Sequence, residues 1–239
     1  MNLAIDIGNT RTKIGIFDAG KQLKTWVFDN HHPINWTAIL LENNIQNAII
    51  SSTIPIEASI LQAIQQVSKY IILNEQTLLP FTNQYATKDT LGKDRLALIA
   101  AAHAAYPNQH NLVIGCGTCI TFNFINAQNQ FLGGSIHPGL KMRLKAMHTF
   151  TGKLPLVALQ NDANLFGNDT NSNILSGVLY AASKEIDGMI DDYLVKFPEM
   201  NIIITGGDAE LLVYRLKNQI FAIPDFTLLG LNHILEYNA

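Results

Sequence analysis

Apolar runs and amphipathic segments alternate along the chain. Short Ile-rich runs, such as residues 48–52 and 201–205, are typical of buried strands. Residues 91–105 instead carry Leu96 and Ile99 at helical spacing, which predicts a helix. Because strands and helices alternate in both halves of the chain, the pattern indicates an α/β fold.

The expected elements fall into two series, separated by the break Pro107-Asn108-Gln109. The first holds a hairpin at 3–17, strands at 24–28, 48–52 and 70–73, and helices at 35–43, 57–67 and 91–105. The second holds a hairpin at 112–125, a glycine-rich loop at 133–134, helices at 140–149, 172–197 and 209–217, and a strand at 201–205. We therefore predict two domains, residues 1–109 and 110–239.

The first hairpin carries a candidate phosphate site at its turn. Asp6 ends an apolar strand, where a carboxylate is costly unless it meets a cation or a donor. Gly8 lets a ligand approach the backbone, and Asn9, Thr10 and Lys13 follow with donors and a positive charge. This set suits a nucleotide triphosphate with its magnesium ion. The alternative is a plain hairpin turn with Asp6 hydrogen-bonded locally.

The same pattern returns in the second half. Residues 2–9 and 111–118 align in register, so that Gly8 matches Gly117 and Thr12 matches Thr121. A repeat spaced by about half the chain implies two similar halves that face each other, each giving a phosphate-binding hairpin to one cleft. The second copy has Gly115 where the first has Asp6, so it lacks the carboxylate.

Composition and charge exclude several classes of protein. A chain of 239 residues with 48% hydrophobic and 15% charged residues is typical of a folded soluble protein. Its net charge of -3 gives no electrostatic case for binding nucleic acid. No run is long enough to span a bilayer, and no signal peptide is evident, so we expect a cytoplasmic protein without membrane partners.

Two further segments carry candidate chemistry. Thr205-Gly206-Gly207 follows a predicted buried strand and precedes a helix, which suits the adenosine side of a nucleotide site. Gly92-Lys93-Asp94-Arg95 stands at a predicted helix start. There Asp94 could accept a proton from an acceptor hydroxyl, and Arg95 could hold a carboxylate with two hydrogen bonds. The alternative is a helix cap with Arg95 exposed.

Taken in order, these motifs resemble the type III pantothenate kinases, members of the acetate kinase, sugar kinase, Hsp70 and actin superfamily. The resemblance spans nearly the whole chain. Its motifs are Asp6-Ile-Gly-Asn-Thr-x-x-Lys13, Tyr85 with Gly92-x-Asp94-Arg95, Gly117-Thr118-x-x-Thr121, Gly133-Gly-x-Ile-x-Pro-Gly139, Thr151-Gly-Lys-Leu-Pro155, Gly167-Asn-Asp-Thr170 with Ser176-Gly177, and Thr205-Gly-Gly207.

The resemblance implies a fold of two RNase H-like (actin-like ATPase) halves around a nucleotide cleft. It also implies ATP-dependent phosphorylation of pantothenate to 4′-phosphopantothenate, the first step of coenzyme A synthesis. Asp94 would then be the general base. Expected pantothenate contacts are Tyr85, Gly92, Lys93, Asp94, Arg95 and Thr170, and expected ATP contacts are Asp6, Gly8, Asn9, Thr10, Lys13, Gly117, Thr118, Thr121, Gly206 and Gly207.

The resemblance also implies a homodimer with its site at the subunit interface, so that Thr170 would come from the partner chain. Asp6 would hold magnesium, directly or through water. The family pattern has Asp at the position of Gly115, a residue linked to a monovalent cation requirement (K⁺ or NH₄⁺), and often Asp where Asn123 stands. Gly115 therefore predicts altered handling of the monovalent cation.

Two alternative functions stay open at this point. Gly115 is compatible with a non-catalytic, nucleotide-responsive binding protein of the same fold. A kinase for another small hydroxy acid would use the same phosphate motifs. Tyr85 and Arg95 favour an acidic, partly apolar acceptor over a sugar, because a sugar site needs several side chains that pair with hydroxyls.

Overall fold

The computed structural model describes residues 1–161 and 163–239, and it groups into two compact units. The first unit contains residues 1–108, 128–132 and 225–239, and the second contains 109–127 and 133–224. The predicted division at 109/110 differs from this grouping in two places, since residues 128–132 and 225–239 join the first unit.

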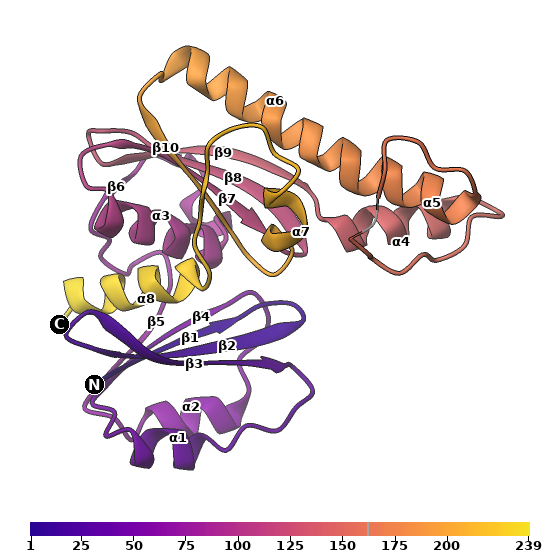
Figure 1. Cartoon of the computed structure of the whole chain (residues 1–239). Helices are drawn as coiled ribbons and strands as arrows, with labels where there is room; N and C mark the ends of the chain where they lie inside the picture. Colours follow the sequence, from indigo (N-terminus) through magenta and orange to yellow (C-terminus); the bar gives the residue numbers. More distant parts are fainter. Residues whose placement is uncertain (162) are drawn as a thin grey trace. The chain divides into compact units, whose positions relative to one another are not determined.

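The first unit is built on a five-stranded sheet of order β3-β2-β1-β4-β5 (Figure 1). Its strands are β1 Asn2–Ile7, β2 Arg11–Asp18, β3 Lys21–Asp29, β4 Asn47–Ser52 and β5 Lys69–Ile72. β1 pairs antiparallel with β2 and parallel with β4. β1 is therefore a central strand, and its carboxyl end lies beside that of β4.

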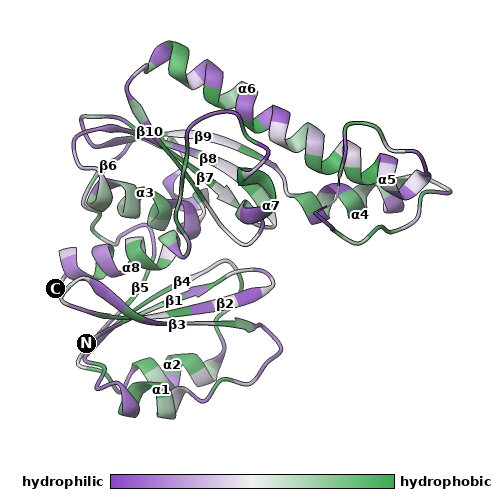
Figure 2. Cartoon of the chain, in the orientation of Figure 1, coloured by the Kyte–Doolittle hydropathy of each residue, from purple (hydrophilic) through white to green (hydrophobic). Residues whose placement is uncertain are grey.

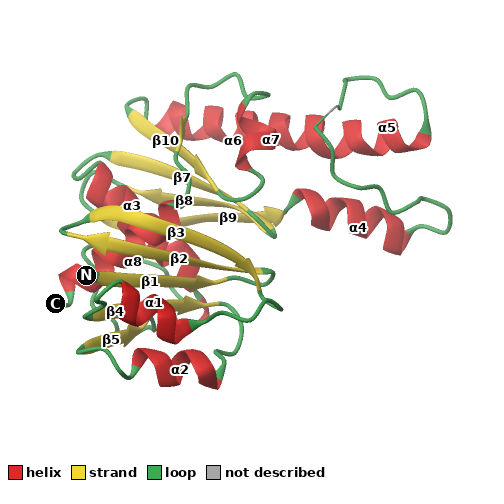
Figure 3. Cartoon of the chain, turned by 60° about the horizontal axis from the view of Figure 1, so that its bottom comes forward, coloured by secondary structure: helices red, strands yellow, loops and turns green. Residues whose placement is uncertain are grey.

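One face of this sheet is covered by α1 Trp36–Glu42 and α2 Ala58–Ile64 (Figure 3). Leu3, Ile5 and Ile7 of β1 form one hydrophobic cluster with the buried residues of both helices. Since side chains alternate along a strand, Asp6 points to the opposite face.

That opposite face carries α3 Lys93–Ala105 and α8 Phe226–Tyr237 (Figure 1). The two helices pack with their backbones in contact, because a Cβ at Gly230 would lie 1.8 Å from the carbonyl oxygen of Ala97. A Cβ at Gly15 of β2 would lie 3.2 Å from Leu228 of α8. The C-terminal helix is thus tied closely to α3 and to β2, which explains why it belongs to the first unit.

The second unit holds the strands β11-β10-β7-β8-β9 in that order. Their bounds are β7 His110–Cys116, β8 Cys119–Ile125, β9 Gln130–Pro138, β10 Met200–Thr205 and β11 Phe221–Ala222. The first three residues of β9 belong to the first unit, and the first two of them pair with the short strand β6 Thr82–Asn83. A 3₁₀ helix, η1 Lys88–Thr90, follows β6.

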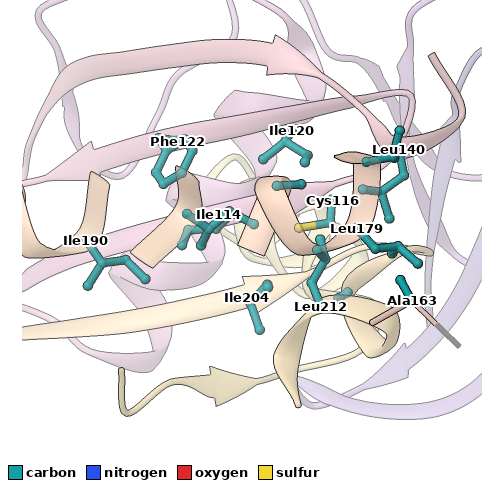
Figure 4. Packing of buried hydrophobic residues seen from close by; sticks show 14 of the residues in the cluster. Ile114, Cys116, Ile120, Phe122, Leu140, Ala163, Leu179, Ile190, Ile204 and Leu212 are labelled. Carbon is teal, nitrogen blue, oxygen red and sulfur yellow. The ribbon is translucent and has the colours of Figure 1, made fainter. Parts of the chain in front are cut away.

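The helices of the second unit are α4 Leu140–Phe150, α5 Thr170–Leu175, α6 Ala181–Lys196 and α7 Ala209–Val213. Hydrophobic and hydrophilic residues alternate along α6 (Figure 2), and Ile186 and Ile190 are buried on its apolar side. They join a core with Ile114 of β7, Phe122 of β8 and other residues (Figure 4).

Three sequence predictions for this unit need correction. Gly133-Gly134 lies within β9 rather than in a loop. Gly134 is needed because its Cβ would meet the carbonyl oxygen of Phe122 at 1.9 Å. The helix predicted at 172–197 is interrupted by a π-helical segment, Ser176–Tyr180, and the helix predicted at 209–217 ends at Val213.

No helix in the described part of the chain is both long and apolar enough to cross a membrane.

Candidate active site

Three polar residues form a row across the first unit's sheet. Asp6 of β1 is paired in register with Lys13 of β2 on one side and with Ser51 of β4 on the other. Neighbouring residues in register share a face, so all three side chains point to the face that carries α3 and α8. Polar side chains therefore gather at the carboxyl end of β1 and β4.

Two helices begin near this row. Asp94 is in the first turn of α3, and its charge acts directly on Asp6. Asp225 immediately precedes α8, and its Oδ1 atom lies 3.1 Å from Nζ of Lys13. Asp6 thus interacts with one carboxylate, Asp94, and with the ammonium group of Lys13, which is itself paired with Asp225.

Asp6 is held in an unusual state. Burial and the nearby charge of Asp94 raise the pKa of Asp6 from 3.8 to about 6, although the charge of Lys13 and the neighbouring Ser51 hydroxyl oppose the shift. Its Oδ1 atom is buried and has no hydrogen-bond partner among the described residues. A buried carboxylate oxygen without a partner destabilises the fold, and a cation would satisfy it.

Asp94 is also perturbed. Burial raises its pKa, although the backbone N–H of Arg95 and the charge of Arg95 act in the opposite direction. Gly92 makes room for the carboxylate, because a Cβ at position 92 would lie 2.5 Å from Oδ1 of Asp94. A side chain at position 92 would therefore force the Asp94 carboxylate to move from its present position. A carboxylate with a raised pKa is suited to proton transfer near neutral pH.

The turn at Gly8 is held by side chains as well as backbone. The N–H of Gly8 donates to the carbonyl of Arg11 at 2.9 Å. Asn30 then binds the turn three times. Its Nδ2 donates to the Gly8 carbonyl at 2.8 Å, its Oδ1 accepts from Thr12 Oγ1 at 2.9 Å, and its N–H donates to the Thr10 carbonyl at 3.1 Å. The turn is fixed before any ligand arrives.

Donors remain at the tip of this turn. Asn9 and Thr10 are exposed. Among the described residues, neither of their N–H groups donates a hydrogen bond. Free N–H groups beside Lys13 are what a phosphate oxygen requires.

Arg95 is buried rather than exposed, which corrects the helix-cap alternative. Its guanidinium carbon lies 5.6 Å from the ring centre of Tyr85 and 5.9 Å from that of Phe131. The two rings are themselves stacked, with centres 6.2 Å apart. These contacts fix the plane of the guanidinium group. Lys93, the neighbouring predicted site residue, lies 3.6 Å from the carboxylate of Glu75.

The hairpin turn of the second unit lies between β7 and β8. A Cβ at Gly117 would meet nothing within 4 Å, so the turn is open there, and Thr118 is exposed. Thr121 is buried, and its Oγ1 accepts a hydrogen bond from Nδ2 of Asn123 at 3.1 Å. Gly117 and Thr118 are therefore more exposed than Thr121, although the Gly117 N–H donates to the Cys119 carbonyl at 3.0 Å and the Thr118 carbonyl accepts from the Gly139 N–H at 3.1 Å.

The third glycine motif has a packing role. Gly206 has a φ of +108°, and its Cβ would lie 2.2 Å from the carbonyl oxygen of Cys116. The turn after β10 thus presses against the end of β7, where Thr205 pairs in register with Gly115. Gly207 follows in the same turn, before the five residues of α7.

Thr170 is exposed as the first residue of α5, between the two residues of a capping box, Asp169 and Ser172. A cavity of about 360 Å³ lies in the same part of the second unit, lined by residues that include Gln160, Gly167 and Asn171.

Metal-binding groups are sparse. In the described ranges, no cluster of three or more His, Cys, Asp or Glu side chains is arranged to hold a metal ion. Gly115 offers no side-chain oxygen at the second hairpin. Asp6 is therefore the best candidate for a cation that also binds phosphate and water, a mode that Mg²⁺ commonly adopts.

Some site residues were missed from the sequence. Ser51 could have been found, because it lies near the end of the buried strand predicted at 48–52, although its pairing with β1 is known only from the structure. Asn30 and Asp225 had no local signal, because each acts on a residue far away in the sequence. Phe131 is recognised only through its contact with Arg95.

The family model described as type III pantothenate kinase matches residues 2–192. A type III pantothenate kinase of Christiangramia forsetii is 42% identical over 240 aligned positions, covering 100% of this chain and 99% of the relative.

Two solved structures share the fold. One is described as a conserved putative Baf family transcriptional activator from Campylobacter jejuni, with a TM-score of 0.61, 23% identity and coverage of 99% of this chain and 98% of the other. A ROK family glucokinase from Streptomyces griseus, in complex with glucose and AMPPNP, has a TM-score of 0.55 at 11% identity, with 99% of each chain covered. These likenesses concern the fold alone, and they confirm the predicted two-unit α/β class.

Proposed function

The chain belongs to the type III pantothenate kinase family, and we propose that it transfers the γ-phosphate of ATP to the hydroxyl of pantothenate, giving 4′-phosphopantothenate for coenzyme A synthesis. One observation carries the proposal. Asp94 acts on Asp6 in a row that also holds Lys13, so a base, a cation ligand and a phosphate ligand meet in one unit. Phosphoryl transfer needs these groups.

ATP would be held through its phosphates. In the first unit, the free N–H groups of Asn9 and Thr10 and the ammonium of Lys13 would contact phosphate oxygens, with Gly8 allowing close approach. In the second unit, we assign the matching role to Gly117, Thr118 and Thr121. The backbone at Gly206 and Gly207 would contact the nucleoside.

Magnesium fits the residues present. The unpartnered Oδ1 of Asp6 would bind the ion directly or through water. When bound, the ion would neutralise charge on the phosphates. Because a cation would also lower the pKa of Asp6, binding of MgATP and ionisation of Asp6 would favour each other.

Asp94 would act as general base toward the acceptor hydroxyl of pantothenate. Its raised pKa brings it closer to working pH, where a base both accepts and releases a proton readily. Arg95 would pair with the pantothenate carboxylate, with its plane fixed by Tyr85. Gly92 and Lys93 would complete this side of the acceptor site.

The residues at positions 115 and 123 bear on the expected monovalent cation. Gly115 has no side chain to bind K⁺ or NH₄⁺, and the side-chain nitrogen of Asn123 already donates to Thr121 and to the Val113 carbonyl. We propose that turnover depends only weakly on K⁺. The Gly115→Asp variant tests this, because the added carboxylate should increase K⁺ activation. Equal activation in the variant and the wild type would contradict the assignment.

A homodimer is proposed from the exposed apolar side chains of the second unit. Phe150 and Phe166 are both 85% exposed, and Leu156 and Leu165 are also exposed. Apolar residues gathered on one segment are typical of an interface. Thr170, in the same segment, would contact the pantothenate bound by the other subunit. The cytoplasmic location stays a prediction.

The proposal is tested by incubating the protein with MgATP and an acceptor, then identifying products by mass spectrometry. Pantothenate, pantoate and glucose serve as parallel acceptors. We expect a phosphorylated product from pantothenate at least about 100-fold faster than from the others. A faster reaction with another acceptor would indicate a different kinase. ATP binding without any phosphorylated product would indicate a nucleotide-responsive binding protein.

A further inference from the structure

Asp225 has a backbone conformation that a non-glycine residue rarely adopts. Its φ is +54° and its ψ is 24°, in the left-handed region. This region is unfavourable for residues with a Cβ, although Asn and Asp enter it more readily than others. A strained residue that persists in a fold is a reason to ask what its side chain does.

The side chain of Asp225 does not cap its own helix. Asp225 stands at the N-cap of α8, where an Asp side chain usually accepts a hydrogen bond from the helix backbone, but it makes no such bond. Its Oδ1 instead lies 3.1 Å from Nζ of Lys13, and the two side chains are only 24% and 22% exposed. The Asp225 side chain therefore contacts Lys13, the lysine proposed to bind phosphate, instead of capping α8.

The position of Lys13 matters because Asp6 competes for it. Asp6 is its neighbour in register across β1 and β2, and the two side chains interact. A lysine that closed onto Asp6 would occupy the oxygen needed for a cation. In the structure the Lys13 ammonium is paired with Asp225, and Oδ1 of Asp6 has no partner in the described part of the chain.

We propose that Asp225 is a positioning residue for nucleotide binding. It holds the Lys13 ammonium beside the Gly8 turn and away from Asp6, so that Lys13 meets phosphate and Asp6 meets the metal. The inference rests on the proposed function, because it takes Lys13 as a phosphate ligand.

The packing of α8 makes this position rigid. Gly230 of α8 lies against the backbone of Ala97 in α3, and Leu228 lies against Gly15 in β2. Asp225 is therefore attached to a helix fixed both to the lysine-bearing strand and to α3, whose first turn holds Asp94. Through α8, the position of the Lys13 ammonium is fixed relative to Asp94, the proposed general base.

The Asp225→Gly variant removes the carboxylate without adding backbone strain, so it tests the role of the charge. Glycine adopts a left-handed conformation readily and is an acceptable N-cap, so the fold should be retained without the carboxylate. Asp225→Asn keeps the conformation and an acceptor for Lys13 but removes the charge. Asp29→Asn is the control, since Asp29 pairs with Arg11 at 3.4 Å on the exposed edge strand of the same sheet.

MgATP binding is measured by calorimetry, beside KM for both substrates and the melting temperature. For Asp225→Gly we expect about tenfold weaker MgATP binding and higher KM for ATP, pantothenate KM within twofold, and an unchanged melting temperature. Asp225→Asn should be intermediate, and Asp29→Asn should match the wild type. In a Lys13→Met background, Asp225→Gly should have no further effect on MgATP binding.

Two results would overturn the inference: wild-type MgATP binding by Asp225→Gly, or an equal loss of binding in the presence and absence of Lys13. Because calorimetry needs no acceptor, the inference is judged even if wild-type protein fails to phosphorylate pantothenate. That failure would count against the proposed function alone.

Discussion

Burial and the charge of Asp94, in the first turn of α3, together raise the pKa of Asp6, near the end of β1. Burial raises the pKa of both carboxyl groups, yet their hydrogen-bonding surroundings differ. Asp94 receives a hydrogen bond from the backbone of Arg95, whereas Oδ1 of Asp6 has no partner among the described residues. The difference suits two roles, a proton acceptor and a metal ligand.

Asp6→Asn should stabilise the protein while abolishing activity. The rise in the pKa of Asp6 from 3.8 to about 6 means that the ionised carboxylate destabilises the fold above pH 6 by at most about 3 kcal/mol. The variant should therefore melt a few degrees higher at pH 8. The gain should shrink as pH falls from 6 to 3.8 and vanish below, where Asp6 is protonated in both states.

Thermal denaturation across this pH range checks the prediction. Asp18→Asn is the control, because Asp18 is an exposed Asp on the neighbouring strand. A lower melting temperature for Asp6→Asn at pH 8 would show that the ionised carboxylate is compensated within the protein.

Arg95→Lys should impair acceptor binding. Lysine keeps the charge but loses the planar group that contacts Tyr85 and Phe131 and that can hold a carboxylate with two hydrogen bonds. We expect KM for pantothenate to rise about tenfold or more, with KM for ATP within twofold. Steady-state kinetics with each substrate varied in turn distinguishes this from a rise in both values, which would indicate a general disturbance.

Asn30→Ala should loosen the Gly8 turn. The change removes the side-chain bonds to the Gly8 carbonyl and to Thr12. We expect MgATP to bind roughly five- to tenfold more weakly, because the turn must be ordered on binding. Asn35→Ala is the control, since the Asn35 side chain caps α1 and should affect stability alone. Equal MgATP affinity in both variants would argue against a role for Asn30.

The pair of His103 on α3 and His233 on α8 should make the fold sensitive to acid. The rings are stacked with Nδ1 and Nε2 3.2 Å apart, and burial lowers both pKa values. The unfolded chain therefore takes up protons near pH 6.5 that the folded chain does not, so stability is lost as pH falls below this value.

Melting of His233→Gln between pH 7.5 and 5.5 measures the effect. Over this pH interval, the melting temperature of the variant should fall by roughly 2–4 °C less than that of the wild type. His31→Gln, at an exposed position, should follow the wild type. Parallel curves for His233→Gln and wild type would exclude the pair as the cause.

The sequence predicted the elements well where periodicity alone decides them. Residues 48–52 were expected as a strand and form most of β4, because a short apolar run is stable where it is buried within a sheet. Gly133-Gly134 was misread as a loop. The glycine there serves a close approach between strands, which only the folded backbone reveals.

The site was also predictable only in part, because some of its residues are brought together only by the folded backbone. Asp6, Lys13 and Asp94 belong to local motifs, but Ser51 joins them through strand register and Asp225 through the return of α8 to the first unit. Thr121 occupies a motif position, yet its burial and its bond to Asn123 depend on packing.

Single-turnover transfer from ATP to pantothenate by wild-type protein and Asp94→Asn, with MgATP affinity measured for both, tests the role of Asp94 most directly. We expect the variant to bind MgATP within about threefold of wild type and to form 4′-phosphopantothenate about 10²–10⁴ times more slowly. Transfer by the variant at the wild-type rate would contradict the assignment of Asp94 as the base.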